Sequence, residues 1–157
     1  MTSLVDRIVA YWQWADITVW SLIKDLSDEE FNQSFGEFGG SLRKRYIHLA
    51  EDNWEWYSDW TGADIQEEPD FNNMSKEELF EFISSYNSKW ADLRVTDSEK
   101  TINVGQGDTM ITLTFPEMLF HMNNHATYHR GQIAMCLRLL GKETHMTDYV
   151  PQRLSTA

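Results

Sequence analysis

Two histidines, His125 and His129, are spaced so that they can share one metal ion. They lie four residues apart in a segment with helical periodicity, where such residues share a face with Cβ atoms about 6 Å apart. Apolar residues such as Met122 and Ile133 fall on the same face. Each ring buried there without a partner costs about 1–3 kcal/mol. A divalent metal at about 2.1 Å from each ring nitrogen would supply that partner. Hydrogen-bonded core histidines are the alternative, and spacing alone does not decide between the two.

Two ligands from one helix leave a metal site incomplete, so another segment must contribute. His48 is the only histidine in another long predicted helix, although it lies on the flank of that helix's apolar stripe. His121 lies one turn before His125, near the edge of the stripe. It could be a fourth ligand, a partner of a ligand or a surface residue.

Other residues could support such a site. Asp52 follows His48 by one turn, and Gln132 lies on the His125 side of the last helix, so each could hydrogen-bond a ligand ring. Each could equally be an ordinary polar residue beside the stripe. Arg45 ends the one basic run of the chain and could dock an anionic cofactor, the alternative being ion pairs with the acidic surface. No catalytic residue can be assigned from the sequence.

Four segments with helical periodicity must position these residues. They cover about residues 3–26, 41–60, 75–93 and 114–140, with a short helical turn near 27–30. Three capping pairs mark helix starts: Ser3 with Asp6, Ser75 with Glu78, and Thr114 with Glu117. The stripe of the first helix predicts these core residues: Leu4, Ile8, Tyr11, Ala15, Val19, Leu22 and Leu26.

The apolar period changes to an alternation in residues 101–104 and 110–114, which predicts a small β-hairpin before the last helix. The fold class is therefore all-α, a four-helix bundle with this hairpin. The loop of residues 61–73 is long enough to cross the bundle, so we expect up-down-down-up connectivity. Residues 1–157 form one domain, whose tail from about residue 142 is predicted to be partly irregular.

The composition argues against two classes of binding partner, nucleic acids and anionic membranes. The chain has 157 residues, 41% of them apolar, and a net charge of −12. This charge repels nucleic acid and anionic membrane surfaces. The single cysteine, Cys136, cannot form an internal disulfide, and we find neither a signal peptide nor a membrane-spanning segment. These features predict a cytoplasmic protein. The predicted metal site, rather than the composition, favours a small-molecule substrate.

The pattern resembles the DinB/YfiT-like family of bacterial metalloenzymes over nearly the whole chain. The elements that carry this resemblance are Ser41 and Leu42, Tyr46 to Ala50 with Trp54, His121, Asn124 and His125, Tyr128 to Gln132, Leu139 to Gly141, and Asp148. The resemblance implies a bundle in which His48, His125 and His129 bind a divalent metal, often nickel or zinc. It also implies that dimers are common. Family members of known activity include transferases and isomerases that use the low-molecular-weight thiols bacillithiol or mycothiol.

Three imidazole ligands would leave at least one metal position open, as in catalytic rather than structural sites. We therefore expect a metal-dependent enzyme, such as a transferase that acts on a small thiol. Iron, cobalt or manganese would also accept such ligands. The alternatives are a non-catalytic, metal-binding or stress-related dimer, and a metal-dependent hydrolase.

Overall fold

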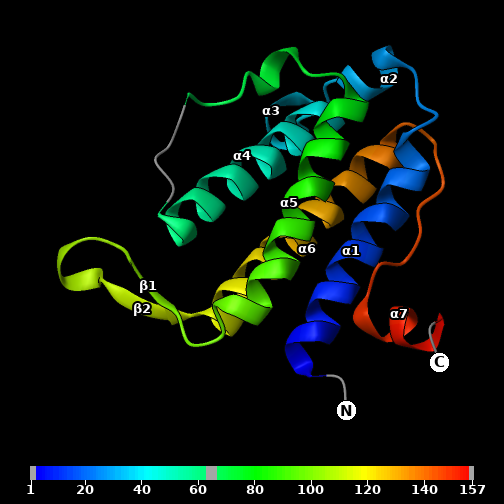
Figure 1. The fold of residues 1–157 in the computed structure, drawn as a ribbon. Coiled ribbons are helices and arrows are strands. Elements are labelled where there is room, and N and C mark those ends of the chain that lie inside the picture. Colours follow the sequence, from blue (N-terminus) through cyan, green and yellow to red (C-terminus); the bar gives the residue numbers. More distant parts are fainter. Residues whose placement is uncertain (1–2, 63–66, 156–157) are drawn as a thin grey trace.

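The computed structural model describes residues 3–62 and 67–155 and consists mainly of a bundle of four long helices (Figure 1). The long helices are α1 (Leu4–Ile23), α4 (Leu42–Thr61), α5 (Lys76–Thr96) and α6 (Phe115–Leu139). The shorter elements are α2 (Asp28–Asn32), α3 (Gly36–Gly39), η1 (Phe71–Asn73), β1 (Thr101–Val104), η2 (Gly107–Thr109), β2 (Ile111–Thr114) and α7 (Tyr149–Ser155). The predicted fold class, all-α with a small hairpin before the last long helix, is confirmed.

Side-chain caps begin the helices where the sequence predicted them. The Ser3 hydroxyl accepts a hydrogen bond from the Asp6 amide at 3.1 Å, and the Asp6 carboxylate accepts one from the Ser3 amide. Ser75 and Glu78 form the same reciprocal pair at the start of α5. These bonds satisfy amide groups that have no partner within the helix, which defines where each helix begins.

The four long helices run up, down, down and up (Figure 1). Helices α4 and α5 are parallel: Arg43 donates to the carbonyl of Met74 at one end, and the Trp60 indole donates to Asp97 at the other. Helix α1 is antiparallel to α5, because Arg94 near the end of α5 pairs with Asp6 near the start of α1. The expected connectivity is therefore confirmed.

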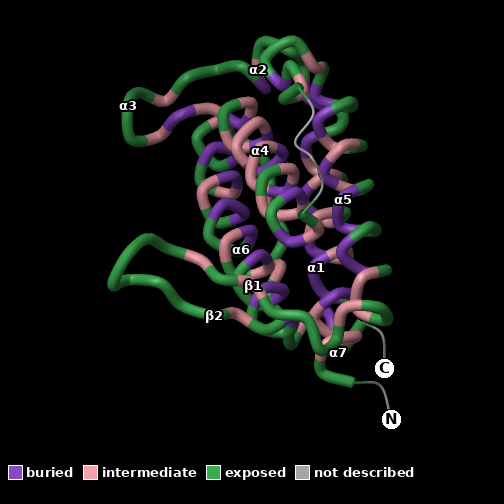
Figure 2. The backbone as a smooth tube through the Cα atoms, turned by 60° about the vertical axis from the view of Figure 1, so that its left-hand side comes forward, coloured by how far each residue is buried: buried purple, intermediate pink, exposed green. Residues whose placement is uncertain are grey.

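The core lies between the long helices, with the buried positions facing inward (Figure 2). Trp12, Trp60 and Trp90 are each at most 1% exposed and are the bulkiest of its fully buried side chains. The stripe predicted for α1 was wrong at Leu4, which is 68% exposed. Because α1 packs against both α5 and α6, its buried face is wider than one stripe and includes Trp12 and Ile23.

The hairpin and the tail complete the fold. Strands β1 and β2 pair antiparallel, with Thr101 opposite Thr114, as predicted. Residues 142–148 have no regular structure, but the tail then forms α7, which the sequence did not predict. The Tyr11 hydroxyl donates to the carbonyl of Thr147 at 2.7 Å, and the ring of Tyr11 contacts that of Tyr149. The tail is thereby fastened to α1.

No helix in the described part of the chain combines the length and the apolar character needed to cross a membrane.

Candidate metal centre

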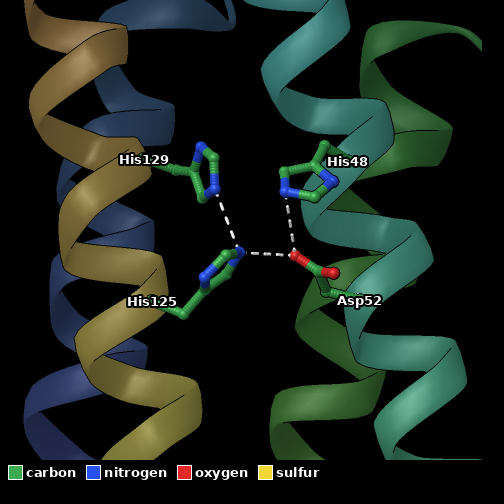
Figure 3. A group of neighbouring side chains, drawn as sticks. All are labelled: His48, Asp52, His125 and His129. Carbon is green, nitrogen blue, oxygen red and sulfur yellow. Dashed lines mark hydrogen bonds and ion pairs between the residues drawn. The ribbon is translucent and has the colours of Figure 1, made fainter.

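Four side chains from two helices converge between α4 and α6 (Figure 3). His48 and Asp52 lie one turn apart on α4, and His125 and His129 lie one turn apart on α6. One potential ligand atom from each lies within 4.8 Å of the others, close enough to surround one metal ion. The structure thus brings together the three histidines named from the sequence and adds Asp52 to them.

The contacts within this cluster are short. The Oδ2 atom of Asp52 lies 2.6 Å from Nε2 of His125 and 3.3 Å from Nε2 of His48. Nε2 of His125 lies 3.0 Å from Nε2 of His129. The Oδ2 atom is buried, yet it accepts no hydrogen bond of acceptable geometry within the described chain, in spite of its short distances to the rings. A buried carboxylate oxygen in that position is costly unless a cation or a well-aligned donor satisfies it.

Gln132 orients the ring of His129. Its Oε1 atom lies 2.8 Å from Nδ1 of His129, and an amide oxygen can only accept a hydrogen bond. Nδ1 therefore carries the proton, and Nε2 presents its lone pair to the cluster. Metal-bound histidines usually have such a partner on the other ring nitrogen. Gln132 thus contacts the ring of His129, whereas the sequence analysis placed it on the His125 side of the helix.

Two further residues named from the sequence lie outside the cluster. The ring of His121 packs edge-on against Trp56, with centroids 5.0 Å apart, and lies 6.2 Å from the ring of His125. Its nitrogen atoms are not among the four converging ligand atoms. Arg45 lies near the start of α4 and lines a cavity beside the cluster.

This cavity has a volume of about 670 Å³ and is open to solvent. His48, His129 and Gln132 line it together with residues from the first turns of α4. The volume lies within the range of small-molecule sites, about 300–1,000 Å³. A ligand in the cavity would meet two of the clustered histidines, so the cluster is accessible from one side.

The donor set fits a divalent metal. Three neutral imidazoles and one carboxylate suit zinc, nickel, iron or cobalt, and the cluster supplies only one formal negative charge. From the sequence, Asp52 was predicted only as a possible hydrogen-bond partner of a ligand ring. The signal for a larger role was its spacing, because His48 and Asp52 repeat the four-residue interval of His125 and His129.

We expect the ring of His129 to stay neutral in mildly acidic solution when the protein is metal-free. Burial lowers its pKa, and the nearby rings of His125 and His48 lower it further, to about 4. An unfolded histidine has a pKa of about 6.5. The unfolded chain therefore takes up this proton at a higher pH than the folded chain, and folding loses stability as the pH falls from 6.5 towards 4.

Imidazole NMR resonances measured against pH, in folded and in urea-unfolded protein, check this expectation. A midpoint between pH 6 and 7 for His129 in the folded, metal-free protein would contradict it.

Comparison with known proteins supplies the family. The DinB family matches residues 1–156. The chain is also similar to the protein named DinB from Bacillus subtilis (strain 168), with 24% identity over 160 residues that cover 95% of this chain and 93% of that protein. The match extends over all four long helices and both histidine-bearing segments, in agreement with the resemblance noted in the sequence. The chain therefore belongs to the DinB family.

Proposed function

We propose that this protein binds one divalent metal ion, nickel or zinc, through His48, His125 and His129, and uses it to transfer a small thiol to an electrophilic substrate. The observation that carries this proposal is the convergence of the three rings beside an open cavity. A bound metal would lower the pKa of a thiol and so favour its nucleophilic thiolate at neutral pH. The thiol would lose its proton to solvent, and its sulfur would bond to the electrophilic carbon as the bond from that carbon to a leaving group breaks.

The chain's own residues would perform the remaining tasks. Gln132 would hold the proton of His129 on Nδ1, which keeps Nε2 free to bind. Asp52 would either bind the metal as a fourth ligand or orient His48 and His125. The cavity would hold the thiol and the electrophile next to each other, which raises their effective concentration. No residue in this account acts as a general acid or base.

Metal analysis and a conjugation assay test this function. We expect natively purified protein to contain about one metal per chain. We also expect metal-dependent conjugation of a model electrophile with a small thiol. Protein that takes up no metal, after native purification and after reconstitution, would refute the proposal. Metal-dependent ester hydrolysis without thiol conjugation would favour the hydrolase instead.

A non-catalytic metal-binding protein is the second candidate, because all four clustered side chains come from only two helices. A metal there would tie α4 to α6 and stabilise the bundle by linkage. In that case chelation should lower the melting temperature, while no thiol or ester substrate reacts.

We further propose that the protein is a cytoplasmic homodimer that uses the outer face of α6. This face exposes apolar side chains at four positions: Phe120, Tyr128, Met135 and Leu139. Residues 118–142 include no Asp or Glu, in a chain that has 25 of them. Two copies of a protein with net charge −12 would meet with least repulsion at such a face.

The Met135→Glu variant tests this interface. We expect wild-type protein to be dimeric in size-exclusion chromatography with light scattering, and the variant to be monomeric, because the new charge would be buried between the copies. Ile17→Glu is the matched control, since Ile17 is an exposed apolar residue on α1. A monomeric wild-type protein, or equal dissociation by both variants, would contradict the proposed face.

A further inference from the structure

The cavity beside the histidine cluster has a basic wall. Arg43, Lys44 and Arg45 all line it, and Glu51 is the one acidic residue among the described residues of the lining. The full chain has 13 basic and 25 acidic residues. Three of the 13 basic side chains therefore face one cavity in a protein that is otherwise strongly acidic. This local reversal of charge would attract an anion to the site.

None of the three basic side chains forms an ion pair with a carboxylate in the described part of the chain. Arg43 instead donates to the carbonyl oxygens of Asn72 and Met74, at 2.5 and 2.8 Å. Carbonyl groups fix the guanidinium but do not neutralise it. From the sequence, ion pairs with acidic residues were the alternative role of Arg45. No carboxylate in the described part of the chain forms such a pair with Arg45.

Arg45 has hydrogen-bond donors that its protein contacts leave unused. Its Nη2 atom makes only long contacts, 3.5 Å to the carbonyl of Phe38 and 3.4 Å to that of Gly39. Its Nε atom is buried and has no hydrogen-bond partner within residues 3–62 and 67–155. A guanidinium prefers planar, two-pronged contacts with carboxylate or phosphate oxygens, and this one has donors left for such a contact.

The backbone near Arg45 is shaped to admit it. Gly40 has a φ of +64°, and a Cβ atom there would lie 3.1 Å from Nη2 of Arg45. A larger residue at this position would be strained and would also crowd the guanidinium.

The basic run also lies where positive charge is costly for the helix. Ser41 caps α4, and the partial positive charge of the helix amino end lies next to the three cations. Cations at that end destabilise a helix, whereas a bound anion would relieve both the cations and the helix end. Arg43 also holds the segment before α5, but a ligand would explain why Lys44 and Arg45 lie at this end of the helix.

We propose that this wall binds a carboxylate or phosphate group of the small-molecule substrate, with Arg45 as the principal contact. His48, His129 and Arg45 line the same cavity, so a molecule anchored at Arg45 would extend towards the histidine cluster. The inference rests on the proposed function, because it names the chemical class of substrate for that site. The substrate or thiol would thus carry an acidic group some distance from its reactive atom.

Calorimetric titration with inorganic phosphate and with malonate tests the proposal, in metal-free and in zinc-loaded protein at low salt. We expect at least one of the two anions to bind wild-type protein in both forms. Arg45→Gln should weaken that binding about tenfold or more, as expected for the loss of a charge-assisted contact. The two anions distinguish a phosphate from a carboxylate substrate. Binding should also weaken with added salt.

Two further variants make the result specific. Lys44→Gln alters an exposed side chain, so the variant should fold normally. The lost positive charge should weaken its affinity for the anion several-fold. Arg138→Gln removes an exposed cation of α6 that does not line the cavity, so it should bind the anion as wild-type protein does. Equal affinity in wild-type, Arg45→Gln and Lys44→Gln proteins would overturn the proposal. Failure of both phosphate and malonate to bind wild-type protein would also overturn it.

The test of anion binding can fail or succeed independently of the test of metal binding. A separate zinc titration should give the same affinity for Arg45→Gln and wild-type proteins, because Arg45 is not among the clustered ligands. Failure of wild-type protein to take up zinc would refute the metal site while the metal-free anion titration stays informative. Normal zinc uptake without anion binding would refute only the basic wall.

Discussion

Replacing His129 by alanine is expected to weaken divalent-metal binding by about a hundredfold or more. Zinc-finger peptides bind their metal with about 10–16 kcal/mol through four ligands, so one ligand contributes about 3 kcal/mol, which is about a hundredfold in affinity. His129 is 4% exposed, and the Gln132 amide holds its ring, so no other side chain can easily take its position. Competition with a chromophoric chelator measures the affinity for zinc and for nickel.

His121→Ala is the matched control for this variant. His121 is the same residue type on the same helix, two turns before His129, yet it packs on Trp56 outside the cluster. We expect its removal to leave metal affinity close to that of wild-type protein. Equal losses from His121→Ala and His129→Ala would mean that the cluster is not the binding site. Circular dichroism of both variants separates a lost ligand from a lost fold.

Arg130→Met is expected to lower the free energy of unfolding by about 3–5 kcal/mol, because it leaves a buried carboxylate without its cation. Arg130 follows His129 on α6 but points towards α1, where its Nη1 atom lies 2.9 Å from Oδ1 of Asp16. The side chain of Arg130 is 2% exposed and that of Asp16 is 14% exposed. Asn87 of α5 donates to the other oxygen of Asp16 at 2.8 Å, so three helices meet in this network. Urea denaturation of metal-free protein measures the loss.

Arg94→Met provides the comparison. Arg94 and Asp6 also join a long helix to α1, at 3.0 Å, but both side chains are more than a third exposed. Solvent screens that pair, so we expect a loss several times smaller. An Arg130→Met protein no less stable than Arg94→Met would show that the buried pair does not hold α6 in place. Because α6 carries His125 and His129, we also expect Arg130→Met to weaken metal binding.

The helices themselves could be predicted from local patterns. Capping pairs such as Ser75 with Glu78 mark helix starts because they satisfy amides that the helix leaves open, an effect contained within four residues. The hairpin followed from alternation, which reflects the two-residue period of a strand. The helix in the carboxy-terminal tail could not be predicted in this way. Helix α7 is short, and it is fastened by contacts between Tyr11 and residues 147–149, more than 130 positions along the chain.

Half of the candidate metal centre could also be predicted from spacing. The four-residue interval of His125 and His129 places both rings on one helical face, whatever the rest of the fold does. His48 lay on the flank of its stripe, so its selection depended on its being the only histidine in another long helix and on the family resemblance. Its proximity to His129, with ring centroids 4.6 Å apart, exists only because α4 and α6 pack against each other.

The sequence by itself determined the net charge, which is a sum over its residues. It also determined the four long helices, the hairpin and the placing of two histidines on one helical face, because each of these follows from short-range periodicity. The tertiary structure alone decided that Asp52 joins the three rings and that Arg45 borders the same cavity. It also decided that Arg130 is buried against Asp16. The physical reason is that periodicity identifies which face of a helix is apolar but not which helix covers it or at what rotation. Residues 48 and 52 meet residues 125 and 129 only after the packing of four helices has set that rotation.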